Sequence, residues 1–261
     1  MSIKCRDVMS SLRILAPENL AEDWDNVGLL LGSGDRIVEK LLLCLDVTPQ
    51  VAKEALRLDA DMIVSHHPII FNTIKSINNE TPEGKMLYSL IRNETSVFCS
   101  HTNLDICENG LNRYLAEKLE LLDIHNSVNS SDENKYVKIG RLSAAKDIDK
   151  FTVIVKENLG VKNLRIIGDV QDQITNVAVF CGGYDARLCE GIKGEAEILV
   201  TGDIKYHDAQ EIANNGFCAI DAGHFGTEVI VKELLFTYLK SKFPNIDIIS
   251  SASENDPFRF Y

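Results

Sequence analysis

The sequence predicts an α/β protein with two similar lobes, each a mostly parallel sheet flanked by helices. Three observations support this. Short apolar runs of strand length alternate with stretches that have the periodicity of amphipathic helices. The alternation occurs on both sides of a polar stretch rich in Ser and Asn. Segments of the second half also resemble the first at constant offsets. We expect an N-terminal lobe (1–125), a polar linker (126–150) and a C-terminal lobe (151–261) that behave as one unit with a site between the lobes.

In the first half, three short apolar runs indicate strands that are buried on both faces, because they show no alternation of polar and apolar residues. They are KLLLCLD (40–46), DMIVS (61–65) and SVFCS (96–100). Helical periodicity runs over 2–15, 49–58, 83–93 and 110–122. Strands that alternate with helices are typical of a parallel sheet, because parallel neighbours need a long crossover connection.

The second half contains the same kinds of elements. Strands are predicted in NLRIIGD (163–169) and over 176–183, 197–201, 217–221 and 246–250. Helices are predicted over 185–194, over 207–216, where Gly216 closes the helix, and over 227–243.

Two offsets relate the halves to each other. A shift of 136 residues places LLLCL (41–45) on VAVFC (177–181) and, without a gap, ADMIVS (60–65) on AEILVT (196–201). A shift of 123 places SHTNLD (100–105) on GHFGTE (223–228), which matches His101 to His224 and Asp105 to Glu228. These matches favour an ancient duplication, although βαβ units of similar length also resemble one another.

The composition limits the classes of partner and compartment. The 261 residues include 27 Lys and Arg against 39 Asp and Glu, a net charge of −12. Affinity for nucleic acid comes largely from Lys and Arg on phosphates, so the charge argues against such a partner but allows a small-molecule substrate such as a nucleotide. No apolar run approaches the roughly 18 residues of a membrane span. Seven cysteines without a Cys-x-x-Cys pair, and no apolar signal-peptide core, predict a cytoplasmic location.

The histidines indicate where the chemistry lies. Five of the six follow a predicted strand at its C-terminal end, where ligands bind in open α/β sheets: His66, His67, His101, His207 and His224. Three have a carboxylate four residues away, a spacing that places two side chains on one face of a helix. The pairs are His101 with Asp105, His207 with Asp203, and His224 with Glu228. Imidazole and carboxylate are ligands of zinc, iron and manganese.

Two adjacent histidines in IVSHHPIIF (63–71) suggest more than one ion. Neighbouring side chains of a strand point to opposite faces, so a turn after Ser65 would let His66 and His67 each reach a different ion. Three histidines and two carboxylates exceed the needs of one catalytic metal and suit two ions that share a bridging carboxylate. The sequence therefore predicts two divalent ions, which could be Zn, Fe or Mn.

Other polar residues have simpler interpretations. His125 lies in a polar stretch and is expected to be structural, and His207 with Asp203 suits a structural or supporting role as well as ligation. By chemistry alone, Trp24 of WDN (24–26) is a core anchor and Asp25 caps a turn. FCGGYD (180–185) suggests a tight turn whose backbone could donate to an anionic ligand, but no P-loop or dinucleotide-cofactor fingerprint is complete. No Gly-x-Ser-x-Gly elbow is present, which disfavours a serine hydrolase.

Seven separated motifs occur in a characteristic order: AEDWDNVGLLLG, LDVT, IVSHHPIIF, HTNLD, TGDIKYHDA, DAGHFGTE and ENDPF. Together they closely resemble the NIF-three-like family, whose members are often called GTP cyclohydrolase I type 2 homologs or dinuclear metal-centre proteins. The match runs from about residue 2 to the C-terminus. It implies a two-lobed α/β fold, a metal pair between the lobes and a homohexameric ring built as a trimer of dimers. The chain departs from the family at Phe225, where relatives often have tyrosine, and at 123–150, where many bacterial relatives carry an extra domain.

The resemblance also implies residue roles. The family's metal ligands fall on His66, His67, Asp105, His224 and Glu228, with Glu228 as the bridging carboxylate. His101 lies beside the metals in the family pattern.

These roles lead to an expected function. We expect a metal-dependent hydrolase that resembles GTP cyclohydrolase I type 2, in which a hydroxide bridging the ions attacks a cyclic amide, an amidine or a phosphoester. His101 or His207 would carry the proton. The alternative is a non-catalytic metal-binding or regulatory ring protein that keeps the same ligands.

Overall fold

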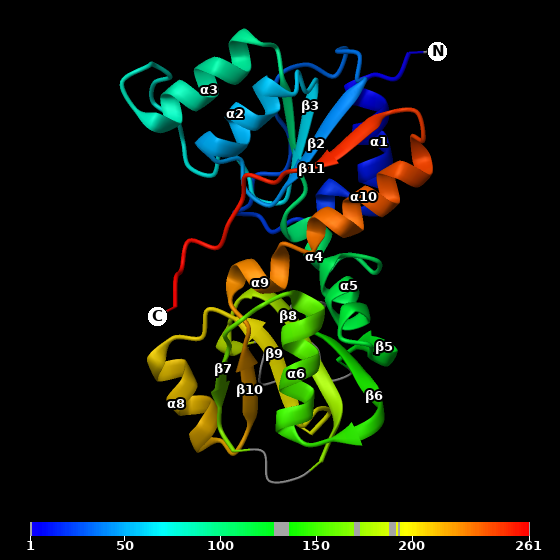
Figure 1. Ribbon diagram of the computed structural model, residues 1–261, viewed down its shortest axis with the longest axis vertical. Helices are drawn as coiled ribbons and strands as arrows, with labels where there is room; N and C mark the ends of the chain where they lie inside the picture. The colour runs from blue at the N-terminus through cyan, green and yellow to red at the C-terminus, as the bar shows by residue number, and fades with distance from the viewer. Residues whose placement is uncertain (1, 128–135, 170–172, 188–191, 193, 261) are drawn as a thin grey trace. The chain divides into compact units, whose positions relative to one another are not determined.

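The computed structural model describes residues 2–127, 136–169, 173–187, 192 and 194–260, and it confirms the α/β class. The chain forms two compact units, each built on its own sheet flanked by helices (Figure 1). The first unit spans Met1–Cys107 and Val231–Asn255, and the second spans Glu108–Ile230 and Asp256–Tyr261.

A sheet of five described strands forms the centre of the first unit, in the order β1-β4-β3-β2-β11. β1 is antiparallel to β4, whereas β4, β3, β2 and β11 run parallel to one another. The strands are β1 (Gly28–Leu31), β2 (Lys40–Cys44), β3 (Met62–Ser65), β4 (Ser96–Cys99) and β11 (Asp247–Ser250). The helices are α1 (Cys5–Leu15), the 3-10 helix η1 (Glu18–Leu20), α2 (Pro49–Arg57), α3 (Pro82–Arg92), α4 (Thr102–Ile106) and α10 (Val231–Lys242).

Helices cover both faces of this sheet, which explains why its strands are continuously apolar. On one face, Leu42 of β2 and Ile63 of β3 belong to a buried cluster with Val51 of α2 and Leu87 of α3. α1 and α10 lie on the other side of the sheet (Figure 1), where α10 packs against β2 and β11. Burial of one such aliphatic side chain stabilises a fold by about 1.5–3 kcal/mol. The helices packed on both faces therefore hold the ends of the strands in fixed positions.

The second unit contains a mixed sheet with the strand order β5-β6-β8-β9-β10-β7 among its described residues. β8, β9 and β10 are parallel, whereas β5, β6 and β7 each pair antiparallel with their neighbours. The strands are β5 (Leu122–Asn126), β6 (Lys138–Lys146), β7 (Arg165–Ile167), β8 (Ile174–Gly183), β9 (Ile198–Gly202) and β10 (Cys218–Asp221). The helices are α5 (Leu111–Lys118), α6 (Ile148–Leu159), α8 (Tyr206–Asn214) and α9 (His224–Glu228). The expected mostly parallel arrangement thus holds for three of these strands, because apolar patterning indicates a strand but not its direction.

The structure divides the chain differently from the predicted ranges. β6 lies inside the stretch 126–150 that was expected to be a linker, and residues 128–135 of that stretch lie outside the described residues. α5 and β5 belong to the second unit rather than to the lobe predicted over 1–125. α10 and β11 belong to the first unit, because β11 pairs with β2. Periodicity shows that an apolar segment is a strand, but not which sheet it joins.

Two further predictions change in detail. The helix predicted over 227–243 is divided into α9 and α10, and the short helix α4 had no counterpart among the predicted elements. The helix predicted over 185–194 falls partly on residues 188–191 and 193, which lie outside the described residues.

The strand registers are consistent with the predicted duplication. Leu41 pairs with Met62 in the first sheet, and Val177 pairs with Ile198 in the second. The paired residues are separated by the same distance along the sequence in both cases, and both pairs of strands are parallel. Throughout the described part of the chain, each helix is too short or too polar to cross a membrane.

Candidate metal centre

The backbone turns directly after β3, as the adjacent histidines require. The Ser65 hydroxyl donates to the His67 carbonyl at 2.8 Å, and the N–H groups of His66 and His67 donate to the carbonyls of Cys44 and Leu45. The His66 side chain is fully buried, whereas the His67 side chain is 21 % exposed. The two rings lie 5.1 Å apart with their planes tilted by 38°. The turn therefore places both imidazoles at the C-terminal edge of the sheet, where the sequence predicted them.

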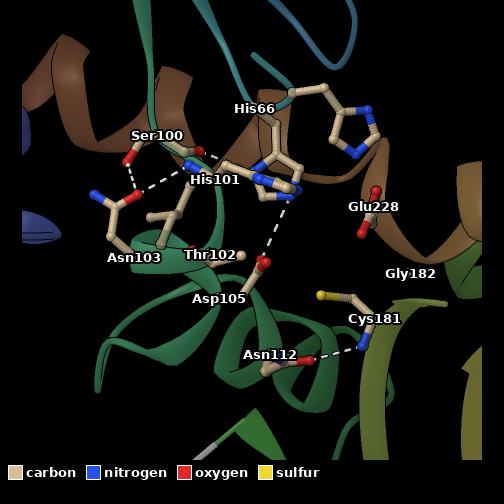
Figure 2. Close-up of polar contacts among 12 residues, drawn as sticks. His66, Ser100, His101, Thr102, Asn103, Asp105, Asn112, Cys181, Gly182 and Glu228 are labelled. Atoms are coloured by element: carbon tan, nitrogen blue, oxygen red, sulfur yellow. Dashed lines mark hydrogen bonds and ion pairs between the residues drawn. The ribbon is translucent and has the colours of Figure 1, made fainter. Parts of the chain in front are cut away.

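His101, which follows β4, joins these two histidines. Its ring centroid lies 5.2 Å from that of His66 and 5.3 Å from that of His67. One nitrogen from each of the three rings lies within 4.8 Å of the other two. Asp105 of α4 adds a carboxylate, whose Oδ1 lies 3.4 Å from Nε2 of His66 (Figure 2). The first unit thus gathers His66, His67, His101 and Asp105, a donor set suited to a divalent metal.

Each of the three imidazoles has its Nδ1 against an oxygen that can only accept a hydrogen bond. The contacts are His66 to the Ser100 carbonyl, His67 to Asp46 Oδ1 and His101 to Asp25 Oδ1, all at 2.9 Å. A carbonyl or an ionised carboxylate requires a donor, so Nδ1 carries the hydrogen and the lone pair is on Nε2. Histidines that bind metals almost always have this outer partner, which fixes the tautomer and the ring orientation.

Asp25 is the most firmly held of these acceptors. Its side chain is fully buried, and it also accepts from the N–H of Thr102 at 3.1 Å and from the Thr102 hydroxyl. Burial raises the pKa of this carboxyl, but hydrogen bonds from His101 and Thr102 outweigh burial and lower the pKa to about 2. Asp25 therefore stays ionised. The sequence suggested that Asp25 caps a local turn, but it revealed neither the contact with Thr102 nor the contact with His101.

Trp24 is not the core anchor that its chemistry alone suggested. The residue is 59 % exposed, and its ring contacts Phe71 and His101. In this turn the Asp25 side chain is buried, and its carboxylate binds the first residue of α4. Trp24 lies at the surface instead.

The carboxylate that holds His67 is itself supported by the C-terminal segment. Glu254, the first residue of ENDPF, accepts from the N–H groups of Leu45 and Asp46 at 2.7 and 2.8 Å. Its other oxygen lies 3.1 Å from Nζ of Lys232, and both side chains are largely buried. Glu254 therefore fixes the turn after β2, which places Asp46 against His67. This accounts for the motif at the C-terminus that the sequence singled out.

In the second unit, α9 brings His224 and Glu228 together. Nε2 of His224 lies 2.9 Å from Oε2 of Glu228, which confirms the pairing expected from their four-residue spacing. Nδ1 of His224 lies 2.9 Å from Oδ2 of Asp203. His224 therefore resembles the three histidines of the first unit, because an acceptor oxygen lies on its Nδ1 and a further ligand residue lies beside its Nε2.

Gly182 on β8 makes room for this pair. A Cβ atom on Gly182 would lie 2.2 Å from Oε1 of Glu228 and 3.5 Å from Nε2 of His224, and the residue has a φ of +73°. Its N–H donates to the Thr227 hydroxyl at 3.0 Å, and the N–H of Cys181 donates to Asn112 at 2.7 Å (Figure 2). The glycine turn therefore shapes the space around the carboxylate. The N–H groups of Gly182 and Cys181 therefore bind side chains of the same unit rather than an anionic ligand.

His207 and Asp203 do not share a helical face, because α8 begins only at Tyr206. Asp203 instead binds His224. His207 is exposed, its ring packs on Tyr206, and its Nδ1 lies 3.3 Å from Gln210. These neighbours include none of the predicted ligands. His125 on β5 is bound to the Asp123 carbonyl at 2.8 Å, which agrees with a structural role.

Two cysteines that contact the backbone of His66 are poor candidates for ligation. Cys44 and Cys99 are buried at the ends of β2 and β4, and burial raises the pKa of both thiols well above the ordinary value. A metal binds the thiolate, so these residues stay protonated and behave as small core residues. The ligands that the structure gathers at His66 are therefore imidazoles and a carboxylate, which fit zinc, iron or manganese.

Comparisons with known proteins agree with the sequence and the fold. The model of the family described as Duf34/NIF3 (NGG1p interacting factor 3) matches residues 3–257. A Clostridium perfringens protein named GTP cyclohydrolase 1 type 2 homolog is 33% identical, and the match covers 99% of this chain and 100% of the relative. A Helicobacter pylori protein (strain J99) named GTP cyclohydrolase 1 type 2 is 34% identical over 90% of this chain and 93% of its own.

Solved structures share the fold from end to end. A hypothetical protein of Staphylococcus aureus matches with a TM-score of 0.91 and 27% identity, and the match covers 100% of both chains. Reduced HcgD from Methanocaldococcus jannaschii matches with a TM-score of 0.79 and 27% identity, over 96% of this chain and 98% of that chain. By the family match and by identity over nearly its whole length, this chain belongs to the Duf34/NIF3 family.

Proposed function

We propose that this protein is a metal-dependent hydrolase that holds two divalent ions and opens a cyclic amide or amidine, or cleaves a phosphoester. The main observation behind this proposal is that four histidine rings are oriented by the same kind of contact. His66, His67, His101 and His224 each have Nδ1 against a carbonyl or a carboxylate. Outer partners of this kind orient imidazoles for metal binding and are not needed for packing alone.

The ligands we assign are the five that the sequence predicted. His66, His67 and Asp105 come from the first unit, and His224 and Glu228 come from the second. Glu228, with Gly182 leaving space beside it, is the residue we assign as the bridging carboxylate. Two bound ions would polarise the substrate and lower the pKa of a bound water toward neutrality.

The chain's own residues would then move the proton. Hydrolysis of a cyclic amide forms a C–O bond, breaks the C–N bond and transfers one proton from water to the departing nitrogen. We assign this transfer to Nε2 of His101, because Asp25 holds the hydrogen on Nδ1 and stabilises the imidazolium that forms. His207 has neither a carboxylate partner nor a predicted ligand among its contacts in the described residues, and it is the weaker candidate.

The names of relatives suggest the first substrate to test. Related proteins are named GTP cyclohydrolase 1 type 2 or homologs of it. GTP is a nucleotide whose imidazole ring opens by hydrolysis, which fits the proposed chemistry. We therefore place GTP first, ahead of other cyclic amides and phosphoesters.

A second candidate function is a metal-binding or regulatory protein without turnover. The family description, NGG1p interacting factor 3, names an interaction rather than a reaction. Such a protein, which we would expect as a homohexameric ring, could use the same ligands to stabilise its assembly. Light scattering of metal-free and metal-loaded protein measures that assembly directly.

The two candidates are separated by one assay. Protein stripped of metal with a chelator is reloaded with Mn²⁺, Zn²⁺ or, without oxygen, Fe²⁺, and then incubated with GTP, a cyclic amide and an aryl phosphate. We expect turnover that requires metal, is lost in Glu228→Gln and is kept in His125→Ala. Binding of metal without turnover of any substrate would contradict the hydrolase and favour the second candidate.

A further inference from the structure

We propose that Trp24 and Phe71 form a stacking site for the flat heteroaromatic ring of a small-molecule ligand. The inference deepens the proposed function, because it assigns the residues that select the substrate class. It depends on the proposed function only in assuming that the bound ring is then hydrolysed.

The two side chains form an exposed aromatic pair next to the histidines. Trp24 is 59 % exposed and Phe71 is 52 % exposed, and their ring centroids lie 6.0 Å apart with planes tilted by 60°. The Trp24 ring also lies 6.2 Å from the His101 ring, at 76°. A single exposed aromatic residue needs no explanation, but an exposed pair that continues into three imidazoles marks a binding surface.

The turn that carries Trp24 is held rigidly although the ring is exposed. On its C-terminal side, the buried carboxylate of Asp25 binds His101 and Thr102. The Asn26 side chain donates to the carbonyl of Ile70 at 2.6 Å, and this bond ties the turn to the segment that carries Phe71. The backbone at both rings is therefore ordered before any ligand arrives. A preorganised aromatic surface loses little conformational entropy on binding.

The geometry selects a flat ring rather than a flexible or aliphatic ligand. Two rings tilted by 60° make a corner, so a flat ring that stacks on the indole meets the phenyl ring at an angle that aromatic pairs favour. A ring stacked on the indole also lies close to perpendicular to the His101 ring, since the planes of Trp24 and His101 differ by 76°. Purines, pyrimidines and pteridines have this shape. The net charge of −12 points to a small molecule rather than a nucleic-acid strand.

Trp24 is the only tryptophan, so its fluorescence reports on the site without interference. We would titrate metal-free protein with guanosine, which carries the flat ring, and with ribose, which lacks it. Both probes are uncharged, so the acidity of the protein does not separate them. We expect guanosine to quench Trp24 and ribose to leave it unchanged. Equal quenching by both, or by neither, would overturn the proposal.

Variants measured by calorimetry complete the test. Stacking of a base on an aromatic side chain predicts that Phe71→Ala weakens guanosine binding about tenfold and Trp24→Ala at least as much, whereas Trp24→Phe keeps most of the affinity. The control is Tyr88→Ala on α3, an exposed aromatic residue away from this pair, which should bind as the native protein does. Native affinity in both Phe71→Ala and Trp24→Ala would overturn the site. So would a changed oligomeric state without a change in affinity, since the rings would then form a subunit contact.

The measurement separates this inference from the proposed function. Guanosine binding is read without metal and without turnover. Binding that depends on Phe71, in a protein that never hydrolyses a substrate, supports the stacking site and contradicts only the hydrolase.

Discussion

Single residues around the histidines decide what the candidate metal centre can do. An imidazole on its own rotates and exists as two tautomers, so four histidines do not define a site. Here each Nδ1 is bound by an oxygen, from Asp25, Asp46, Ser100 or Asp203. These partners fix which ring nitrogen faces a metal. The chemistry therefore depends on residues that would not themselves touch an ion.

The substitution Asp25→Asn tests this directly. It keeps the shape of the side chain and removes the charge that stabilises His101. We expect metal affinity, or turnover with metal, to fall roughly 10- to 100-fold. The exposed neighbour Asp23 provides the control, and Asp23→Asn should behave as the native protein does. Unchanged affinity and turnover in Asp25→Asn would show that the contact with His101 is incidental.

Asp25 also predicts a pH dependence of stability. Its folded-state pKa of about 2 lies below the ordinary value of 3.8, so the ionised carboxylate stabilises the fold above about pH 4. That contribution is lost as the pH falls from about 4 toward 2. Denaturant unfolding of metal-free protein should show the native chain and Asp25→Asn converging over this range. A constant difference in their free energies of unfolding would contradict the assignment.

Gly182 gives a second test at this scale. A Cβ atom in Gly182→Ala would overlap the Glu228 carboxylate, so we expect metal binding to be lost. Gly160 has a similar positive φ but nothing within 4 Å of an added Cβ, so Gly160→Ala carries the backbone strain of about 1–2 kcal/mol without the overlap. Gly183→Ala has neither problem. Metal titration of the three variants should single out Gly182→Ala, and equal losses in Gly160→Ala would point to strain alone.

At the scale of elements, the turn after β2 is held by the C-terminal segment. Glu254→Gln removes the charge that faces Lys232 and the N–H groups of Leu45 and Asp46. Hydrogen bonds to charged groups contribute about 1.5–3 kcal/mol each, so unfolding by denaturant should show a loss of this order. Metal affinity should fall as well, because Asp46 loses its fixed position against His67.

A double-mutant cycle shows whether Glu254 acts through Asp46. If it does, Glu254→Gln should weaken metal binding little further in an Asp46→Asn background, because the contact it supports is already removed. Glu80→Gln, an exposed change in a loop, serves as the control. If the two losses of metal affinity are fully additive, Glu254 does not act through Asp46. Glu254→Gln would still lower the free energy of unfolding in that case.

Most elements could be predicted because their residues carry local signals. β2, β3 and β4 are short apolar runs, and α2 and α3 begin with a Thr cap followed by Pro. The sheet that β11 joins could not be predicted, because β11 pairs with a strand some two hundred residues earlier. The direction of β7 was hidden for the same reason, and β5 and β6 were not predicted as strands at all. The pattern of apolar residues shows which segments are buried, whereas the pairing of strands depends on the tertiary fold.

In the candidate site, too, local contacts could be predicted from the sequence and long-range contacts could not. Spacing predicted His224 with Glu228, because α9 is helical over this interval. The spacing did not predict the contacts of Asp203 and His207, because Asp203 lies before α8 and His207 lies within it. His101 is the residue before α4, and its side chain binds Asp25 rather than Asp105. The partners of the imidazoles come from distant turns, which no local spacing reveals.

For the whole molecule, the predicted ligands are divided between the two units. Bound metal should therefore stabilise the protein, because an ion that binds the folded state and not the unfolded state raises the free energy of unfolding. At a free metal concentration 100 times the dissociation constant, the gain is about 2.7 kcal/mol. Thermal unfolding of chelated protein, before and after addition of Mn²⁺, should show a rise in Tm. The rise should be absent in His66→Ala, and a Tm that metal does not alter would count against a site in the folded protein.

The proposed function requires that one chain holds two ions, with ligands contributed by both units. Metal content per chain, measured by mass spectrometry after reloading and removal of free metal, tests it most directly. We expect two ions in the native protein and in His125→Ala, and fewer than two in both His66→Ala and Glu228→Gln. No retained ion in the native protein, or two ions in both of these variants, would contradict it.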